Sequence, residues 1–119
     1  MKPLLRFGAA LALAGFASLA LAHAKLKHSI PANGANLAVP PSELRLTYNE
    51  AVEPAMSSVT VRGPEGKPVA IEKAVVSKQD DKVLSVPLPQ LAPGAYRVEW
   101  STMGHDGHAT KGALSFTVK

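Results

Sequence analysis

Apolar and polar side chains alternate over residues 95–100, which read Ala-Tyr-Arg-Val-Glu-Trp. A period of two residues is typical of a β-strand that buries one face and exposes the other. The same alternation recurs along the chain, most clearly at residues 43–48, 58–62 and 114–118. No segment beyond the first 22 residues shows the helical period of 3.6 residues. The pattern therefore favours an all-β fold.

Turns that contain glycine or proline separate the alternating segments and allow the strands to be counted. We expect seven short strands, at residues 24–28, 43–48, 58–62, 69–76, 83–86, 95–100 and 114–118. The fourth strand is expected to be interrupted near Glu72 and Lys73. Seven short strands in one domain indicate an antiparallel β-sandwich of immunoglobulin-like type.

The first 22 residues have a different character from the rest of the chain. Lys2 and Arg6 precede an almost unbroken apolar run over residues 7–22, and alanine occupies positions 20 and 22. A basic start, a short apolar segment and small residues before the cleavage point are the features of a secretory signal peptide. The apolar run is shorter than the roughly 20 residues that a membrane-spanning helix needs. We therefore expect a cleaved signal peptide at 1–22 and one exported, soluble domain at 23–119.

The composition narrows the chemistry that this domain can carry. The chain contains no cysteine, which excludes disulfides, cysteine-type zinc sites and thiol nucleophiles. A metal ion would have to be held by histidine, carboxylate, methionine or backbone groups. Lysine and arginine are scattered without forming a basic run, so nucleic acid is not an expected partner.

Cleavage after Ala22 would make His23 the first residue, with a free α-amine and an imidazole that can chelate one metal ion together. The alternative is an ordinary histidine that happens to follow the cleavage site. The strand count predicts where other metal donors would lie. In an antiparallel sandwich, the first strand begins and the sixth strand ends at the same end of the molecule. The segment 101–112, which follows the sixth strand, is then expected near His23, provided that the parity of the count is right.

This segment contains His105, Asp106 and His108 within four residues. Together with His23 they offer nitrogen and oxygen donors without sulfur. Such a set suits Cu(II) and, less selectively, Ni(II), and zinc with histidine ligands also remains possible. The alternative is an ordinary turn whose histidines face water.

Motifs that extend over the whole mature chain carry a resemblance to a known family. They are the N-terminal His23, Pro31-Ala32, Leu44-Arg45-Leu46, Asn49-Glu50-Ala51-Val52, the run from Leu91 to Trp100, Asp106-Gly107-His108 and Phe116-Thr117-Val118. In this combination they resemble the CopC family of periplasmic copper-binding proteins. The resemblance implies a small Greek-key β-barrel or sandwich that binds one Cu(II) ion. The implied ligands are His23, through its amine and imidazole, Asp106 and His108.

The resemblance also implies a role in copper homeostasis or resistance, as a periplasmic carrier that is not an enzyme. An inner-membrane copper transporter of CopD type is the partner it suggests, and we expect a monomer. Some family members hold Cu(I) with a methionine-rich insert, but the mature chain has only Met56 and Met103. The chain therefore resembles a Cu(II)-only member.

Four further positions lead to expectations of their own. His105 and His28 stand where smaller residues are more usual in the family, and we expect neither to bind the metal directly. His28 is expected on the exposed face of an early strand. Met56 is expected to pack against the core, whereas the place of Met103 is left open.

Two other functions fit part of the sequence pattern. An N-terminal histidine together with a second histidine also describes the copper brace of lytic polysaccharide monooxygenases, which are oxidative enzymes. The aromatic residues Tyr48, Tyr96, Trp100 and Phe116 lie at alternating strand positions, which leaves no flat aromatic face for a polysaccharide. The other alternative, a metal-free interaction domain of immunoglobulin-like type, applies if cleavage does not occur at Ala22.

Overall fold

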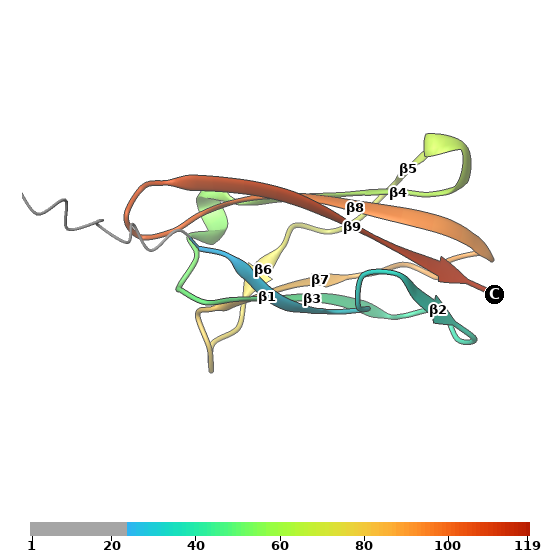
Figure 1. The fold of residues 1–119 in the computed structure, drawn as a ribbon, viewed down its shortest axis with the longest axis horizontal. Coiled ribbons are helices and arrows are strands. Elements are labelled where there is room, and N and C mark those ends of the chain that lie inside the picture. The colour runs from blue at the N-terminus through green and yellow to red at the C-terminus, as the bar shows by residue number, and fades with distance from the viewer. Residues whose placement is uncertain (1–23) are drawn as a thin grey trace, which may run out of the picture.

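The computed structural model describes residues 24–119 (Figure 1). The predicted signal peptide and His23 lie outside the described residues. Within residues 24–119 no helix is long and apolar enough to cross a membrane. The strands are β1 (Leu26–Ile30), β2 (Ala35–Leu37), β3 (Glu43–Tyr48), β4 (Ser58–Arg62), β5 (Pro68–Val69), β6 (Val75–Val76), β7 (Val83–Pro87), β8 (Gly94–Met103) and β9 (Ala109–Val118). Two short 3₁₀ turns, η1 (Pro54–Met56) and η2 (Pro64–Gly66), flank β4.

The strands form two sheets that face each other as a sandwich, which confirms the predicted fold class (Figure 1). One sheet has the order β1-β3-β7-β6 and the other has the order β2-β9-β8-β4-β5. All neighbouring strands are antiparallel except β2 and β9, which run in parallel.

The described residues contain two more strands than the sequence predicted, yet the chain still makes seven passes along the sandwich. β1 and β2 run in the same direction and belong to opposite sheets, so the first pass is divided between the sheets. β5 and β6 divide the fourth pass in the same way, on either side of the expected interruption. Because neither division reverses the chain, the parity of the count is unaffected.

Alternate residues of the longer strands fill the space between the sheets. Leu44, Leu46 and Tyr48 of β3 are completely buried, and the ring of Tyr48 meets that of Trp100 edge to face at 5.4 Å. The four aromatic side chains that were expected at alternating positions are all buried. Burial of this apolar surface is the main source of the stability of a domain without disulfides.

Strands β8 and β9 are longer than the sequence predicted, and the loop between them is correspondingly shorter. The ladder of the two strands extends to the pair Met103 and Ala109, so only residues 104–108 form the loop. The alternation of apolar and polar side chains is not visible in the first half of β9, because Gly112 lies under the indole of Trp100 and has no side chain of its own. A Cβ atom at Gly112 would come within 2.3 Å of that ring. From the loop, β9 carries the chain to the opposite end of the sandwich, where Lys119 donates its N–H to the Leu37 carbonyl (Figure 1).

The first strand is displaced from its predicted position. β1 begins at Leu26 and extends to Ile30, whereas the sequence predicted residues 24–28. Ala24 and Lys25 are instead held by side chains of other elements, since Lys25 donates its N–H to Oδ1 of Asn49 and the carbonyl of Ala24 accepts a side-chain hydrogen bond.

Candidate metal centre

The loop between β8 and β9 is a compact turn closed by backbone hydrogen bonds. Gly104 donates its N–H to the His108 carbonyl at 3.2 Å, and Gly107 donates to the Gly104 carbonyl at 3.0 Å. Gly107 has a φ of +80°, a conformation that side chains with a Cβ atom rarely adopt. The loop therefore presents residues 105–108 in a defined arrangement at the end of the sandwich.

Two of the predicted metal ligands, Asp106 and His108, lie side by side in this loop. Oδ1 of Asp106 accepts the backbone N–H of His108 at 2.9 Å, and Oδ2 lies 3.1 Å from Nδ1 of the His108 ring. Two ligand atoms that each lie about 2.0–2.1 Å from one metal ion are roughly 2.9 Å apart at a right angle and about 3.3 Å apart at a tetrahedral angle. The separation of these carboxylate and imidazole groups is thus compatible with binding to a common ion.

The His105 ring pairs with Glu53 and not with Asp106, the partner of His108. Its Nε2 atom lies 2.9 Å from Oε1 of Glu53, and both side chains are about half exposed. Glu53 also donates its backbone N–H to the Met103 carbonyl, next to the isolated bridge between Val52 and Gly104. The segment before η1 therefore runs alongside the loop and engages His105. No local sequence signal identifies Glu53, because it lies far from His105 along the chain.

Ala24, at the start of the described chain, lies against the same loop. Its carbonyl accepts a hydrogen bond from the Thr110 hydroxyl at 2.7 Å, and its side chain is fully buried. A Cβ atom added to Gly104 would be 3.8 Å from Cβ of Ala24 and 3.0 Å from Oδ1 of Asp106. Ala24 and Asp106 thus flank Gly104, which confirms the prediction from the strand count that the start of the first strand and this loop share one end of the sandwich.

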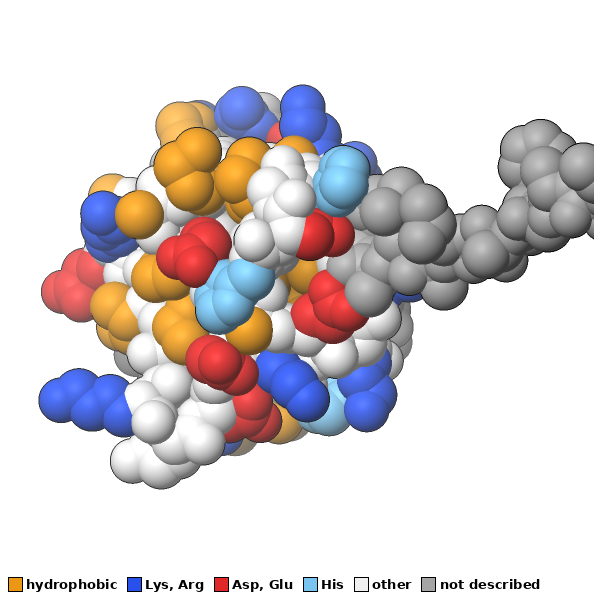
Figure 2. Space-filling model, turned by 90° about the vertical axis from the view of Figure 1, so that its left-hand side faces the viewer, with side chains coloured by type: hydrophobic (Ala, Val, Ile, Leu, Met, Phe, Trp, Pro, Cys, Tyr) orange, Lys and Arg blue, Asp and Glu red, His pale blue; other side chains and the backbone are white. Residues whose placement is uncertain are grey.

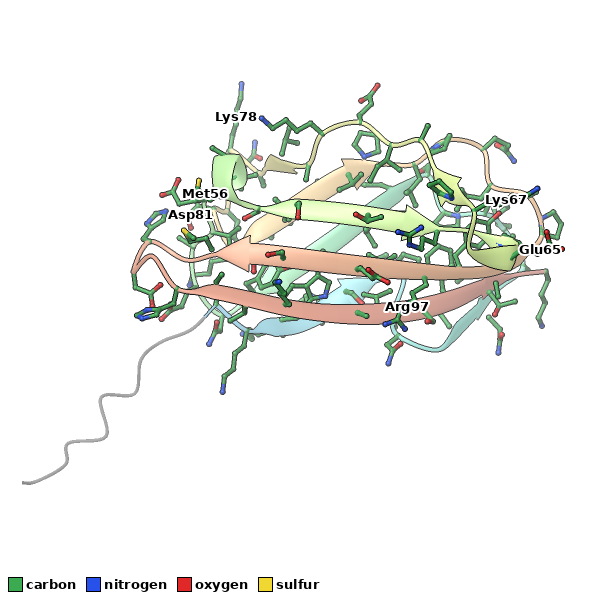
Figure 3. The ribbon with its side chains drawn as sticks, turned by 90° about the horizontal axis from the view of Figure 1, so that it is seen from above. Met56, Glu65, Lys67, Lys78, Asp81 and Arg97 are labelled. Atoms are coloured by element: carbon green, nitrogen blue, oxygen red, sulfur yellow. The ribbon has the colours of Figure 1, made fainter. Side chains whose placement is uncertain are left out.

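The sequence also led to predictions for His28 and Met56, of which the first is confirmed and the second is wrong. His28 is exposed on β1, as predicted, and its strand partner is Thr47. Met56 is 60% exposed, so the expectation that it packs against the core is wrong. This error arose because Met56 belongs to η1, a turn outside the sandwich, and not to the alternating strand that follows. Figure 3 shows Met56 and Asp81 at the loop end of the molecule and Glu65 and Lys67 at the opposite end.

The end of the sandwich that carries the loop is rich in groups that can bind a metal. Figure 2 views this end and shows histidine and carboxylate side chains together on its surface. No three histidine or carboxylate side chains of residues 24–119 converge closely enough to hold a metal ion by themselves.

Comparison with known proteins decides the family. A family model described as the CopC domain matches residues 26–119. The chain belongs to the CopC family. The matched residues include both sheets and the loop that carries Asp106 and His108.

Three relatives of this CopC-family chain span most of its length. A protein named YobA from Escherichia coli K12 is 39% identical over 99 residues, which cover 82% of this chain and 80% of the relative. Copper resistance protein C from Pseudomonas syringae pv. tomato is 32% identical, with 86% and 85% covered. The crystal structure of CopC from Methylosinus trichosporium OB3b superposes with a TM-score of 0.77 at 32% identity, covering 82% of this chain and 94% of that structure. These relationships give the chain a copper-related function.

Proposed function

We propose that this CopC-family protein is exported to the periplasm, where it binds one Cu(II) ion and sequesters it or carries it to a partner. The proposed signal peptide is 1–22, and the mature domain is 23–119. The proposed ligands are His23, through its α-amine and imidazole, Asp106 and His108. CopC-family copper resistance proteins are generally periplasmic, which supports this location.

The position of Ala24 is the observation that carries the proposal. Consecutive Cα atoms are 3.8 Å apart. The Cα atom of a residue bonded to Ala24 therefore lies one residue step from the surroundings of Ala24. These surroundings include Gly104, against which the carboxylate of Asp106 also lies. A mature chain that begins at His23 would therefore bring its amine and imidazole into reach of the loop. The two donors from His23 and the pair in the loop would together complete a site that residues 24–119 do not form alone.

The chemistry of this donor set favours Cu(II) over other common ions. Nitrogen and oxygen ligands without sulfur suit the tetragonal geometry of Cu(II), and copper heads the affinity order of the divalent metals. Cu(I) prefers thiolate or thioether sulfur, and the mature chain has no cysteine and only two methionines. We therefore expect a single tight Cu(II) ion and no tight Cu(I) site.

The exposure of the site supports a carrier role. The side chains of His108 and Asp106 are 46% and 31% exposed, so an ion bound there would be accessible to a second protein. We propose an inner-membrane copper transporter of CopD type as the receiving partner, with this protein acting as a monomer.

The proposal is tested with the exported protein and with a variant that has one extra serine before His23. Mass spectrometry of the exported form should give a chain that begins at His23. Titration should give one equivalent of Cu(II). The extra serine converts the chelating amine to an amide, so Cu(II) affinity should fall at least tenfold, as is typical when a metal site loses part of its support. Proteolytic removal of the serine should restore the affinity. Equal affinity with and without the serine would show that the amine is not a ligand.

A further inference from the structure

A short chain of hydroxyl groups connects the interior of the sandwich to the beginning of the mature domain. The Thr110 hydroxyl lies 2.7 Å from the Ala24 carbonyl, to which it donates its only hydrogen. It also lies 3.2 Å from the Thr102 hydroxyl. Because the hydrogen of Thr110 is already used, Thr102 must be the donor in this second bond. The bonds therefore run from Thr102 through Thr110 to Ala24.

These hydroxyl groups are not needed for the pairing of the strands on which they lie. Thr102 and Thr110 are direct partners in the ladder of β8 and β9, which is held by its own backbone bonds. Thr102 is the one serine or threonine side chain in residues 24–119 that is fully buried. A buried polar group is costly unless it has a partner, so its presence here calls for a reason beyond packing.

The segment before β1 is held by side chains as well as by a backbone hydrogen bond. Lys25 is held by Asn49, whose Oδ1 accepts the Lys25 N–H at 2.7 Å and whose own N–H donates to the Lys25 carbonyl at 2.9 Å. Asn49 belongs to the loop that follows β3. Thr110, two residues beyond His108, ties the segment through its side chain to β9, the strand that follows the loop with the proposed ligands.

We propose that Thr110 is a positioning residue for the copper site, an inference that rests on the proposed function. Its hydroxyl fixes the carbonyl of Ala24, and so holds in place the residue to which His23 is bonded. With this bond, Ala24 is fixed at the loop end of the sandwich before the metal arrives. Without it, part of the binding free energy must be used to order the N-terminal segment, as in other sites that lose preorganisation.

The test compares the variants Thr110→Val, Thr110→Ser and Thr102→Val in the mature protein. The measured quantities are the Cu(II) dissociation constant, by competition with a chelator, and the melting temperature of the metal-free protein. Valine has nearly the shape of threonine but no hydroxyl, so Thr110→Val should bind Cu(II) about 3- to 10-fold more weakly, the equivalent of one typical hydrogen bond. Thr110→Ser keeps the donor and should stay within twofold of the native protein.

Thr102→Val is the matched control, because it removes a neighbouring hydroxyl but leaves the bond from Thr110 to Ala24 in place. It should lower the melting temperature without weakening Cu(II) by more than about twofold. If Thr110→Val folds poorly, Thr110→Ala provides the same comparison. Native affinity in the hydroxyl-free variants of Thr110, or an equal loss in Thr102→Val, would overturn the inference. These results are distinct from failure of the proposed function, in which the native protein itself would not bind one Cu(II) ion.

Discussion

The imidazole of His105 and the carboxylate of Glu53 form a close pair, with 2.9 Å between Nε2 and Oε1. The pair joins the loop between β8 and β9 to the segment that precedes η1. His105 is immediately next to Asp106 in sequence, yet its ring engages a carboxylate on another element. The two histidines of the loop therefore have different carboxylate partners: His108 pairs with Asp106, and His105 pairs with Glu53.

We expect His105→Ala to leave the Cu(II) affinity within about twofold of the native value. Its ring is occupied by Glu53, and an exposed pair of this kind contributes no more than about 1 kcal/mol to stability. Glu53→Gln is the matched variant, since it removes the charge of the partner and retains its shape. Competition titration with a Cu(II) chelator is the measurement. A loss in His105→Ala as large as that caused by His108→Ala would identify His105 as a ligand.

Substitutions in the loop should separate the roles of its two proposed ligands. His108→Ala should weaken Cu(II) at least tenfold, because it removes one nitrogen donor. Asp106→Asn should weaken Cu(II) severalfold, since an amide oxygen can still accept the His108 N–H and preserve the turn but carries no charge. His28→Ala, on the exposed face of β1, should change the affinity less than twofold. Chelator competition and a circular-dichroism melt on each variant would show whether affinity falls without loss of the fold. Equal losses in His28→Ala and His108→Ala would contradict the assignment.

Copper should raise the melting temperature at neutral pH but not near pH 4. Amine and imidazole nitrogens bind a metal only when unprotonated, so protons compete with copper as the pH falls. A ligand that is present at 100 times its dissociation constant stabilises the folded state by about 2.7 kcal/mol. For a domain of this size, that corresponds to an increase of roughly 10–20 °C.

Thermal melts with and without one equivalent of Cu(II), from pH 7 to pH 4, provide the test of this pH dependence. The extended variant with serine before His23 is the control, and its melting temperature should rise much less at pH 7. A copper-induced increase as large at pH 4 as at pH 7 would mean that the ligands are not the amine and imidazoles.

The buried Tyr48 should make the fold sensitive to alkaline pH. Burial raises the pKa of Tyr48 well above its ordinary value, and the nearby Thr102 side chain offsets only part of this rise. The unfolded chain loses this proton near pH 10 whereas the folded chain retains it. The stabilising contribution is therefore complete below pH 10 and is lost as the pH rises further, by up to about 1.4 kcal/mol per pH unit.

Tyr48→Phe removes this dependence. The Tyr48 hydroxyl is buried, and its contact with the Thr102 side chain does not meet the geometry of a hydrogen bond, so its loss should cost little stability at pH 7. Tyr96→Phe is the matched control. Its hydroxyl donates to the Ala92 carbonyl, so its loss should cost about 1 kcal/mol at pH 7. Urea unfolding at pH 7 and at pH 11 measures both effects. The same decrease between the two pH values in Tyr48→Phe as in the native protein would show that Tyr48 is not responsible.

Much of the architecture could be predicted because its causes are local. Alternation in residues 43–48 and 95–100 reflects the two faces of single strands, and each strand can be recognised from its own sequence. The strand count gave the correct end for the loop even though β1/β2 and β5/β6 divide two passes between the sheets. The chain changes sheet in these passes without changing direction, so the parity was insensitive to the division.

The features that could not be predicted depend on residues that are far apart in the sequence. The bond from Thr110 to Ala24 and the pair of His105 with Glu53 each join elements that meet only in the folded protein. The burial of Thr102 gives no signal either, because a threonine in a strand is ordinarily compatible with either face. Sequence alone could therefore identify candidate ligands, but not the groups that hold them in place.

The course of β9 has a practical consequence for how the protein can be handled. Its ten residues span about 30 Å, so Lys119 lies at the far end of the molecule from the loop. A fluorophore, an affinity tag or an electrode linker joined to Lys119 would leave the ligand end facing the solution. Attachment at the other terminus would place the linker on the proposed chelating amine. Molecules anchored through Lys119 would form an oriented layer in which every copy exposes the same face to arriving ions.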